Sequence, residues 1–163
     1  MSFNVDKCKV LHFGHNNQKH MYFMNDLPLE AVESEKDLGI IIHESCKPSQ
    51  QCVIAAKKAN SILGQMNKAF NFKDQKTCVK LFINFVRPHI EYAIQAWCPW
   101  NEHDINLLES VQKRAIKMIP GLRGSYEDKL KTLKLLSLRD RRIRGDAIET
   151  YTTHIKKKDA ASF

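Results

Sequence analysis

The spacing of hydrophobic residues along the chain changes at Pro48. Before this residue the apolar positions form short runs bounded by turn-forming residues, which is typical of strands. Strands are predicted at 8–13, 21–24, 27–32 and 38–42. The two residues between the second and third runs, Asn25 and Asp26, predict a tight hairpin. Gly39 is interpreted as a site of close backbone approach between strands. No helix separates these runs, so we expect a small antiparallel sheet.

After Pro48 the apolar residues recur at the i, i+3, i+4 spacing of helices. Helices are predicted over 52–70, 75–86, 88–97, 102–119, 126–135 and 138–157. The second of these is apolar nearly all round, so we expect it to be central and buried, with Asp74 as its cap. Asn101, Ser125 and Ser137 each stand three residues before an acidic residue, a pattern typical of helix starts.

The fold class predicted from these patterns is α+β. Residues 1–48 form a head of short strands, and residues 49–163 form a bundle of about five or six helices. A few short strands without a covering helix make a marginal unit. We therefore expect the head to lack sheet partners, to have an open edge and to be poorly soluble.

Composition and charge narrow the functional classes. No apolar run approaches the roughly 18 residues of a membrane span, and no secretory signal opens the chain, so we expect an intracellular protein, nuclear or cytoplasmic, that does not bind membranes. The 5 cysteines include no C-x-x-C pair, which favours free thiols and no metal site. The net formal charge is +8, with the excess after residue 48. A basic helical region of this kind favours a polyanionic partner.

A series of short segments carries a family resemblance. These segments are 3–14, 35–40, 58–64, 86–93, 97–100, 108–115, 126–133 and 138–146. In their order and spacing they resemble the reverse transcriptases of non-LTR retrotransposons of the jockey and CR1-like kind, over roughly residues 3–155. The resemblance implies that residues 1–48 are the last strands of the palm and that residues 49–163 are the thumb and the region after the thumb.

The resemblance also implies a role for the hairpin. Residues 22–29 resemble the element that supports the primer 3′ end in this family, which makes Tyr22, Met24 and Asn25 candidate nucleic-acid contacts. Plain packing is the alternative for these side chains. The family usually has Asn-Gly at the turn, and Asp26 replaces the glycine, so the tip is expected to be strained or differently shaped. Lys129 and Asp140 stand where Arg and Glu are more usual.

The catalytic carboxylates of the family are not found in this sequence. The family holds its two Mg²⁺ ions partly through an aromatic-x-Asp-Asp turn that precedes the segment matching residues 7–9. This sequence has no Asp-Asp pair. We therefore expect a truncated fragment that binds no cofactor and does not polymerise DNA by itself. Glu127 and Asp128 are expected to favour the start of a helix rather than to bind metal.

Basic residues on the predicted helices are the remaining candidates for nucleic-acid binding. They are Lys57, Lys58, Lys68, Lys113, Arg114 and Lys117. The expected partners are an RNA/DNA template–primer duplex and the missing upstream palm and fingers portion. Solvated polar helix faces are the alternative, and Glu109 is expected to pair with Lys113.

Other conspicuous residues are assigned mainly to structure. Arginines in the run 139–146 are expected to pair within their helix, Asp140 with Arg144 and Arg142 with Asp146, so that a salt-bridged docking helix is favoured over a nucleic-acid reader. Arg87 and Glu91 are expected to pair in the same way. Trp97 continues an apolar stripe and is expected in the core, while stacking on a base stays open for Trp100.

Two further functions stay open on the sequence. One is a basic helical module that binds protein, with its charge serving solubility. The other is a retroelement relic without function. Salt dependence separates binding to a duplex from apolar docking, because only the former weakens steeply with salt.

Overall fold

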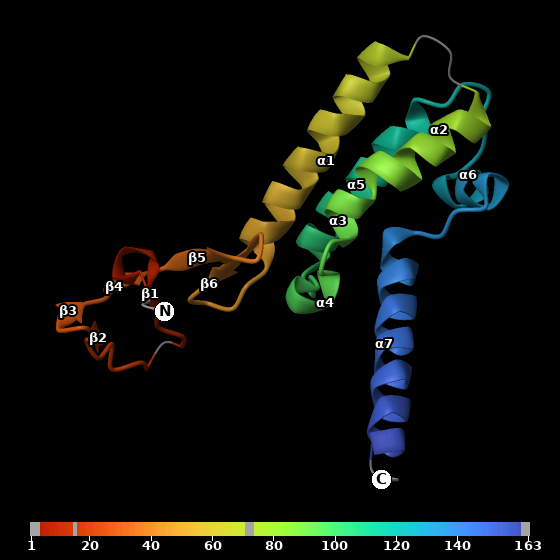
Figure 1. The fold of residues 1–163 in the computed structure, drawn as a ribbon. Helices are drawn as coiled ribbons and strands as arrows, with labels where there is room; N and C mark the ends of the chain where they lie inside the picture. The colour runs from red at the N-terminus through yellow and green to blue at the C-terminus, as the bar shows by residue number, and fades with distance from the viewer. Residues whose placement is uncertain (1–3, 15, 71–73, 161–163) are drawn as a thin grey trace. The chain divides into compact units, whose positions relative to one another are not determined.

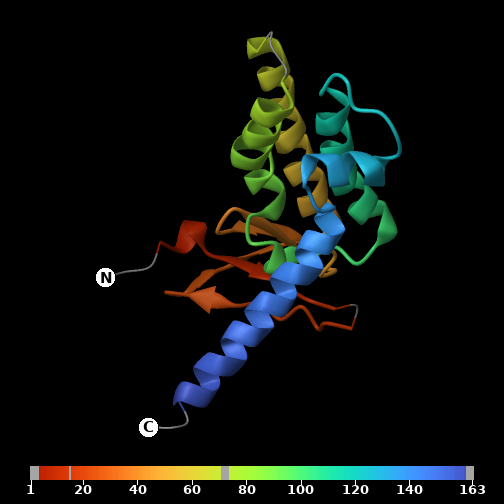
Figure 2. The ribbon, with the colours of Figure 1, turned by 90° about the vertical axis from the view of Figure 1, so that its right-hand side faces the viewer.

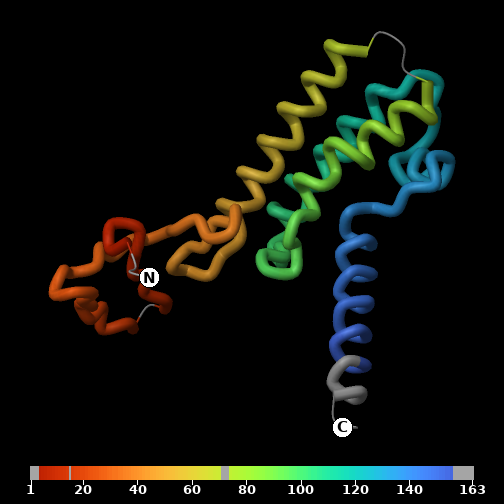
Figure 3. The backbone as a smooth tube through the Cα atoms, viewed as in Figure 1, coloured from red at the N-terminus to blue at the C-terminus, as the bar shows by residue number. Residues whose placement is uncertain are grey.

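A computed structural model of the chain describes residues 4–14, 16–70 and 74–160, with side chains up to residue 155 (Figure 1). The chain divides into two compact units, Met1–Gln51 and Cys52–Phe163, and each is described by itself. The trace in Figure 3 shows short extended segments giving way to helices along the chain. The α+β class predicted from the sequence is confirmed.

The first unit consists of short paired strands. Its elements are η1 (Val5–Lys7), β1 (Lys9–Leu11), β2 (Phe23–Met24), β3 (Leu27–Pro28), β4 (Glu30–Val32), β5 (Ser34–Asp37) and β6 (Ile40–His43). The pairs β2–β3 and β5–β6 are antiparallel, whereas β1 and β4 are parallel, with Val10 opposite Ala31. The parallel pair was not expected, and it arises because the chain between β1 and β4 is long enough to cross over without a helix.

The hairpin predicted around Asn25 and Asp26 is present as β2–β3. Both turn residues have positive φ, 51° and 59°, which is the backbone of a type I′ turn. The Leu29 amide donates to the Tyr22 carbonyl at 2.8 Å and closes the hairpin. Since Asp26 adopts a conformation that glycine adopts more readily, the tip carries the strain expected from the sequence.

A second hairpin corrects the interpretation of Gly39. The turn between β5 and β6 consists of Leu38 and Gly39, with φ of 47° and 88°. Gly39 therefore supplies a turn conformation rather than a close approach between strands, and the strand begins at Ile40 instead of at residue 38. The pattern missed β5 because its residues, Ser34–Asp37, are all polar.

The first unit buries few of its side chains. Within residues 4–14 and 16–51, only Pro48 and Gln51 are buried, and no strand contributes a buried residue. The Gln51 side chain accepts a hydrogen bond from the Ile41 amide at 3.0 Å, which ties the start of the first helix to β6. Strands with so little buried area form a marginal unit.

The second unit is helical. Its elements, with α1 beginning just before it, are α1 (Ser49–Ala69), α2 (Gln75–Leu81), η2 (Phe82–Val86), α3 (Pro88–Glu91), α4 (Ile94–Trp97), α5 (Glu102–Lys117), α6 (Tyr126–Leu133) and α7 (Leu138–Ala160). The predicted caps are present: Asp74 accepts from the Thr77 amide at 3.0 Å, and Ser125 forms a reciprocal capping box with Asp128. Asn101 caps α5 through the His103 amide, at 2.9 Å.

Small residues on α1 let the neighbouring helices approach closely. Cys52, Ala55, Ala56 and Ala59 are all buried on one face of the helix. The α5 residues Leu108, Val111, Ala115 and Ile116 are buried as well, as are Val86 and Ile90 from the central segment. One groove is lined jointly by α1, α2, η2 and α5, so these helices lie side by side. The apolar stripes predicted for α1 and α5 therefore form the core.

The central helices differ from the prediction. The expected buried helix over 75–86 becomes a π-helical turn after Leu81, with the Arg87 amide bonded to the Phe82 carbonyl at 2.9 Å. It buries Phe82 and Val86 but leaves Phe85 57% exposed, so it is not buried all round. The next predicted helix is interrupted at Ala93, whose φ is 48°, and becomes α3 and α4.

Among the side chains of α7 that the structure describes, up to residue 155, the buried ones lie near its start. Leu138 is buried, and Arg142 is 7% exposed. Figures 1 and 2 show the rest of the helix running on past α5. Its apolar stripe is exposed there, with Ile143, Ile148 and Tyr151 each more than half accessible.

Candidate nucleic-acid interface

The polar side of α1 carries cations and no acids. Lys57, Lys58 and Lys68 are all exposed, and α1 contains no Asp or Glu. Eleven residues are close to three helical turns, so Lys57 and Lys68 lie on one side of the helix, about 16 Å apart along its axis. Lys58 points about 100° away from Lys57.

The end of α5 lies beside this polar side of α1. The Arg114 guanidinium donates to the Asn60 side-chain oxygen at 2.8 Å. The two helices run in the same direction in Figures 1 and 2. Asn60 meets Arg114, and further along both helices Met66 lines one groove with Met118. Lys117 is exposed one turn beyond Arg114. We define the basic face as the four residues Lys57, Lys68, Arg114 and Lys117.

No acidic side chain neutralises the basic face among the described residues. The ion pairs found in the described part of the chain involve other groups. Two acids of α5, Asp104 in its first turn and Glu109 near its middle, are buried. Lys117 and Arg114 also stand in the last turns of α5, where cations favour the helix dipole. The basic face is thus a concentrated positive surface on two adjacent helices.

Lys58 and Lys113 are not part of the basic face, because each lies near a different helix. The pKa of His89 is lowered, first by burial and then by the Lys58 charge, which places Lys58 toward α3. The Lys113 ammonium lies 5.2 Å from the centre of the Tyr126 ring, in a cation–π contact with α6. The sequence grouped all six basic residues. The structure places the four of the basic face on the exposed sides of α1 and α5, which Arg114 joins through Asn60.

The expected pair between Glu109 and Lys113 is wrong. Glu109 is only 7% exposed, and it accepts hydrogen bonds from the Tyr126 hydroxyl and from the Leu138 amide, the latter at 3.1 Å. The i, i+4 spacing predicts a pair on an exposed helix surface, whereas Glu109 faces α6 and the start of α7. Lys113 is therefore not neutralised by this carboxylate.

The arginines of α7 pair with other helices. Arg139 contacts Glu102 of α5 at 3.4 Å, and Arg141 donates to Glu91 of α3, with one distance of 2.9 Å. The pairs expected within α7, Asp140 with Arg144 and Arg142 with Asp146, are not among the ion pairs of the described residues. Glu91 also pairs with Arg87 at 3.5 Å, as predicted. This run positions α7, because its charges hold the helix to its neighbours.

The two tryptophans differ in exposure. Trp97 is buried, and its indole N–H donates to the Tyr92 carbonyl at 2.9 Å, so the core assignment is confirmed. Trp100 is 67% exposed, so its ring is accessible to a partner.

The hairpin candidates belong to the first unit. Tyr22 is 53% exposed, and its ring centre lies 6.2 Å from that of His12, at 34° between the planes. Met24 is half-buried, and Asn25 is exposed at the turn. The three side chains therefore differ, and only Tyr22 presents a ring surface.

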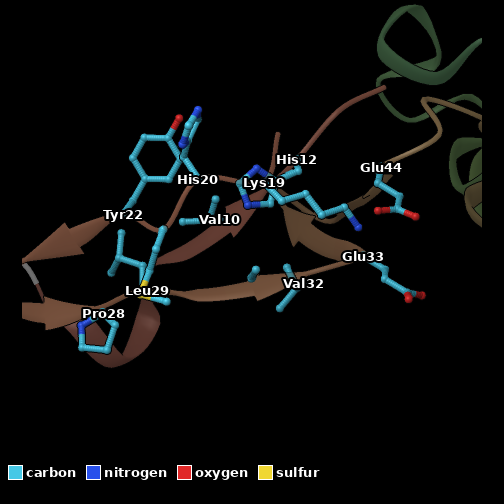
Figure 4. A pocket seen from close by; sticks show the side chains of 12 residues that line it. Val10, His12, Lys19, His20, Tyr22, Pro28, Leu29, Val32, Glu33 and Glu44 are labelled. Carbon is cyan, nitrogen blue, oxygen red and sulfur yellow. The ribbon is translucent and has the colours of Figure 1, made fainter. Parts of the chain in front are cut away.

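Tyr22 also borders a cavity of about 440 Å³ that sequence patterns did not reveal (Figure 4). The cavity lies between β1, β4 and the segment before β2. Its polar lining consists of His12, Lys19, His20, Tyr22, Glu33 and Glu44. These residues follow no motif. The pairing of β1 with β4 brings most of them together, and the β5–β6 hairpin places Glu44 beside Glu33.

Metal-ligating side chains are dispersed over the described residues. No three or more His, Cys, Asp or Glu side chains gather there to hold a metal ion. Asp128 is engaged in its capping box, where hydrogen bonds from Ser125 lower its pKa. Over the same residues, no helix has both the length and the apolar character needed to cross a membrane.

Comparison with known proteins adds no relative. No family model, no curated protein and no solved structure matches this chain.

Proposed function

We propose that this chain binds the phosphate backbone of a nucleic-acid duplex, without regard to sequence, through the basic face. The observation that carries the proposal is the placement of Lys57, Lys68, Arg114 and Lys117 on two adjacent, parallel helices with no acid beside them. Lysine and arginine bind phosphates by charge and position a duplex without reading its bases.

The dimensions of the basic face suit a duplex. Lys57 and Lys68 are about 16 Å apart along α1, which corresponds to about five base pairs at 3.4 Å each. Arg114 keeps further N–H donors available after its bond to Asn60, because a guanidinium has five. Cations spread over this length contact several phosphates at once.

The proposal agrees with the family resemblance of the sequence. In that family a helical thumb packs against the template–primer duplex, and the carboxylates that hold Mg²⁺ precede the segment resembling residues 7–9. The sequence has no Asp-Asp pair, so binding and not nucleotide transfer is the activity assigned to this chain. The upstream part of such an enzyme and an RNA/DNA hybrid are the proposed partners.

Salt dependence of binding tests the proposal. The purified chain is titrated into a labelled RNA–DNA hybrid between 50 and 300 mM salt, and the logarithm of affinity is plotted against that of salt concentration. The triple variant K57A/K68A/K117A should lower the magnitude of the slope by about two to three, since each lost phosphate contact removes about 0.9. Arg114 is left in place because its loss would also break the bond to Asn60.

A matched control removes the same charge elsewhere. The variant K76A/K80A/K131A takes three exposed lysines from α2 and α6 and should keep the wild-type slope. Equal slopes for the basic-face variant and the control would contradict the proposal, as would no binding at 50 mM salt by a chain with its helices intact.

The exposed stripe on α7 favours a second candidate function, a helical module that binds protein. Ile143 and Tyr151 are 62% and 68% exposed and share one side of the helix. Docking of apolar side chains depends little on salt, so a partner held through this stripe would show a slope near zero.

A further inference from the structure

The cavity of the first unit combines ring surfaces with two carboxylates. Its volume of about 440 Å³ falls in the range of small-molecule sites, roughly 300–1,000 Å³. Val10, Leu29, Ala31 and Val32 supply apolar lining. The cavity therefore offers a ligand both an apolar surface and a small number of polar groups.

Rings gather at one end of the cavity. Tyr22, His20 and His12 all line the cavity, and the His12 ring centre is 6.2 Å from that of Tyr22 (Figure 4). The His20 ring nitrogen is hydrogen-bonded to the Gln18 side chain at 2.7 Å, which orients this ring. Exposed aromatic rings stack on unpaired nucleobases of any sequence.

Carboxylates lie at the other end. Glu33 and Glu44 both line the cavity, and the Glu44 amide donates to the Glu33 carbonyl at 2.8 Å, which keeps the two residues adjacent. Lys19 extends toward this end (Figure 4). Carboxylates accept hydrogen bonds from the exocyclic amino groups of bases. With two carboxylates and one lysine, this end of the cavity has a net negative charge, which repels a phosphate group. The cavity therefore favours a base over a phosphate group.

We infer that the cavity takes up one unpaired nucleobase at the end of a duplex, stacked on Tyr22 with its amino edge toward Glu33 and Glu44. This inference rests on the proposed function and adds to it a site for an unpaired base within the first unit. The apolar lining covers the base, and the sugar and phosphate stay at the rim, away from the two carboxylates.

Duplex ends with and without an unpaired base test the inference. The whole chain is titrated with three RNA–DNA hybrids: one blunt, one with a single 3′ overhanging 2-aminopurine and one with the same base at a 5′ overhang. At least one overhang should bind about fivefold to 100-fold more tightly than the blunt hybrid, which is the usual effect of stacking one base. Stacking should also quench the 2-aminopurine fluorescence on binding.

Variants assign the effect to the cavity. Tyr22→Ala should abolish the gain from the overhang, whereas Phe23→Ala, exposed on the same hairpin but outside the cavity, should keep it. Glu44→Gln leaves the hairpin intact. It should reduce the gain for 2-aminopurine more than for an overhanging purine without an amino group.

The outcomes separate this inference from the proposed function. Equal binding of blunt and overhanging hybrids overturns the cavity assignment and leaves duplex binding in place. A gain that survives both Tyr22→Ala and Glu44→Gln overturns it too. Absence of binding to the blunt hybrid overturns the proposed function. Tyr22-dependent quenching of 2-aminopurine in a single-stranded oligonucleotide would then still support the cavity.

Discussion

Glu109→Gln tests whether one buried carboxylate joins three helices of the second unit. The Glu109 side chain accepts from the Tyr126 hydroxyl of α6 and from the Leu138 amide that opens α7. Gln112, one turn further along α5, donates to the Tyr126 hydroxyl at 3.1 Å and to the Leu136 carbonyl at 2.9 Å. The change removes the charge and one acceptor from this network while keeping its size.

The magnitude depends on the number of donors. The Tyr126 hydroxyl and the Leu138 amide both reach Oε1, the latter at 3.3 Å, whereas Oε2 accepts from the Leu138 amide at 3.1 Å. A glutamine therefore loses the charge, and its NH₂ group at the Oε2 position faces the Leu138 N–H, which is also a donor. Hydrogen bonds to a charged group contribute about 1.5–3 kcal/mol each, and a buried donor left without a partner is costly. We expect Glu109→Gln to lower the free energy of unfolding by about 2–3 kcal/mol.

Urea denaturation followed by helical circular dichroism measures this loss. Glu127→Gln on α6 is the control, because it makes the same chemical change on an exposed carboxylate and should stay within about 0.5 kcal/mol of wild type. Tyr126→Phe, alone and combined with Glu109→Gln, completes a double-mutant cycle whose coupling should be about 1 kcal/mol or more. A Glu109→Gln protein as stable as the control would refute the network.

Two other predictions concern the hairpin tip and the alkaline limit of stability. Asp26→Gly should stabilise the hairpin by about 0.5–1 kcal/mol, because glycine adopts the positive φ of this turn without strain, and Asp26→Ala should not stabilise it. The readout is slower hydrogen exchange of the Leu29 amide, which is bonded to the Tyr22 carbonyl. Unchanged exchange in Asp26→Gly would contradict the reasoning. Burial raises the pKa of the Cys52 thiol from 9.0 to about 12, and burial with the Glu109 contact raises the pKa of Tyr126 above its usual 10.0. A raised pKa means that the folded state holds the proton more tightly than the unfolded state does. The contribution of these two groups to the free energy of unfolding is therefore complete below about pH 9 and falls as the pH rises toward 12. Urea midpoints should therefore fall from pH 8 to pH 10.5, less steeply in Cys52→Ala and Tyr126→Phe, and a midpoint independent of pH would count against these shifts.

Local chemistry explains which elements were predictable from the sequence. A cap, a tight turn and a helical stripe each depend on residues within a few positions of one another, so Ser125, Asn25 and the α1 stripe were visible in the sequence. The break in the helix at Ala93 was missed because no residue near it is a helix breaker. The apolar stripe of Ile90, Ile94 and Trp97 continues across the break, and all three residues are buried. The strand β5 was missed because it is wholly polar and exists through pairing with β6.

For the charged residues of the candidate sites, the sequence likewise indicated the helix that carries them but not the partner that they meet. Their spacing identified which helices carry cations. The pair predicted within one helix is present for Arg87 with Glu91, whereas Arg139 and Arg141 of α7 pair with other helices, which the spacing did not predict. A charged side chain meets the partner that packing brings within reach, and sequence spacing reports only neighbours on its own helix. The basic face depends on such a contact, between Arg114 and Asn60.

The sequence by itself determined the α+β class, the hairpin, most helix starts and the basic character of the helical region, because these depend on short-range patterns and on composition. The tertiary structure decided which cations share a surface, that Glu109 is buried in a network, and that six polar side chains border one cavity. These features join residues from separate elements, and their positions depend on packing and strand pairing over the whole unit, which no local pattern of residues encodes.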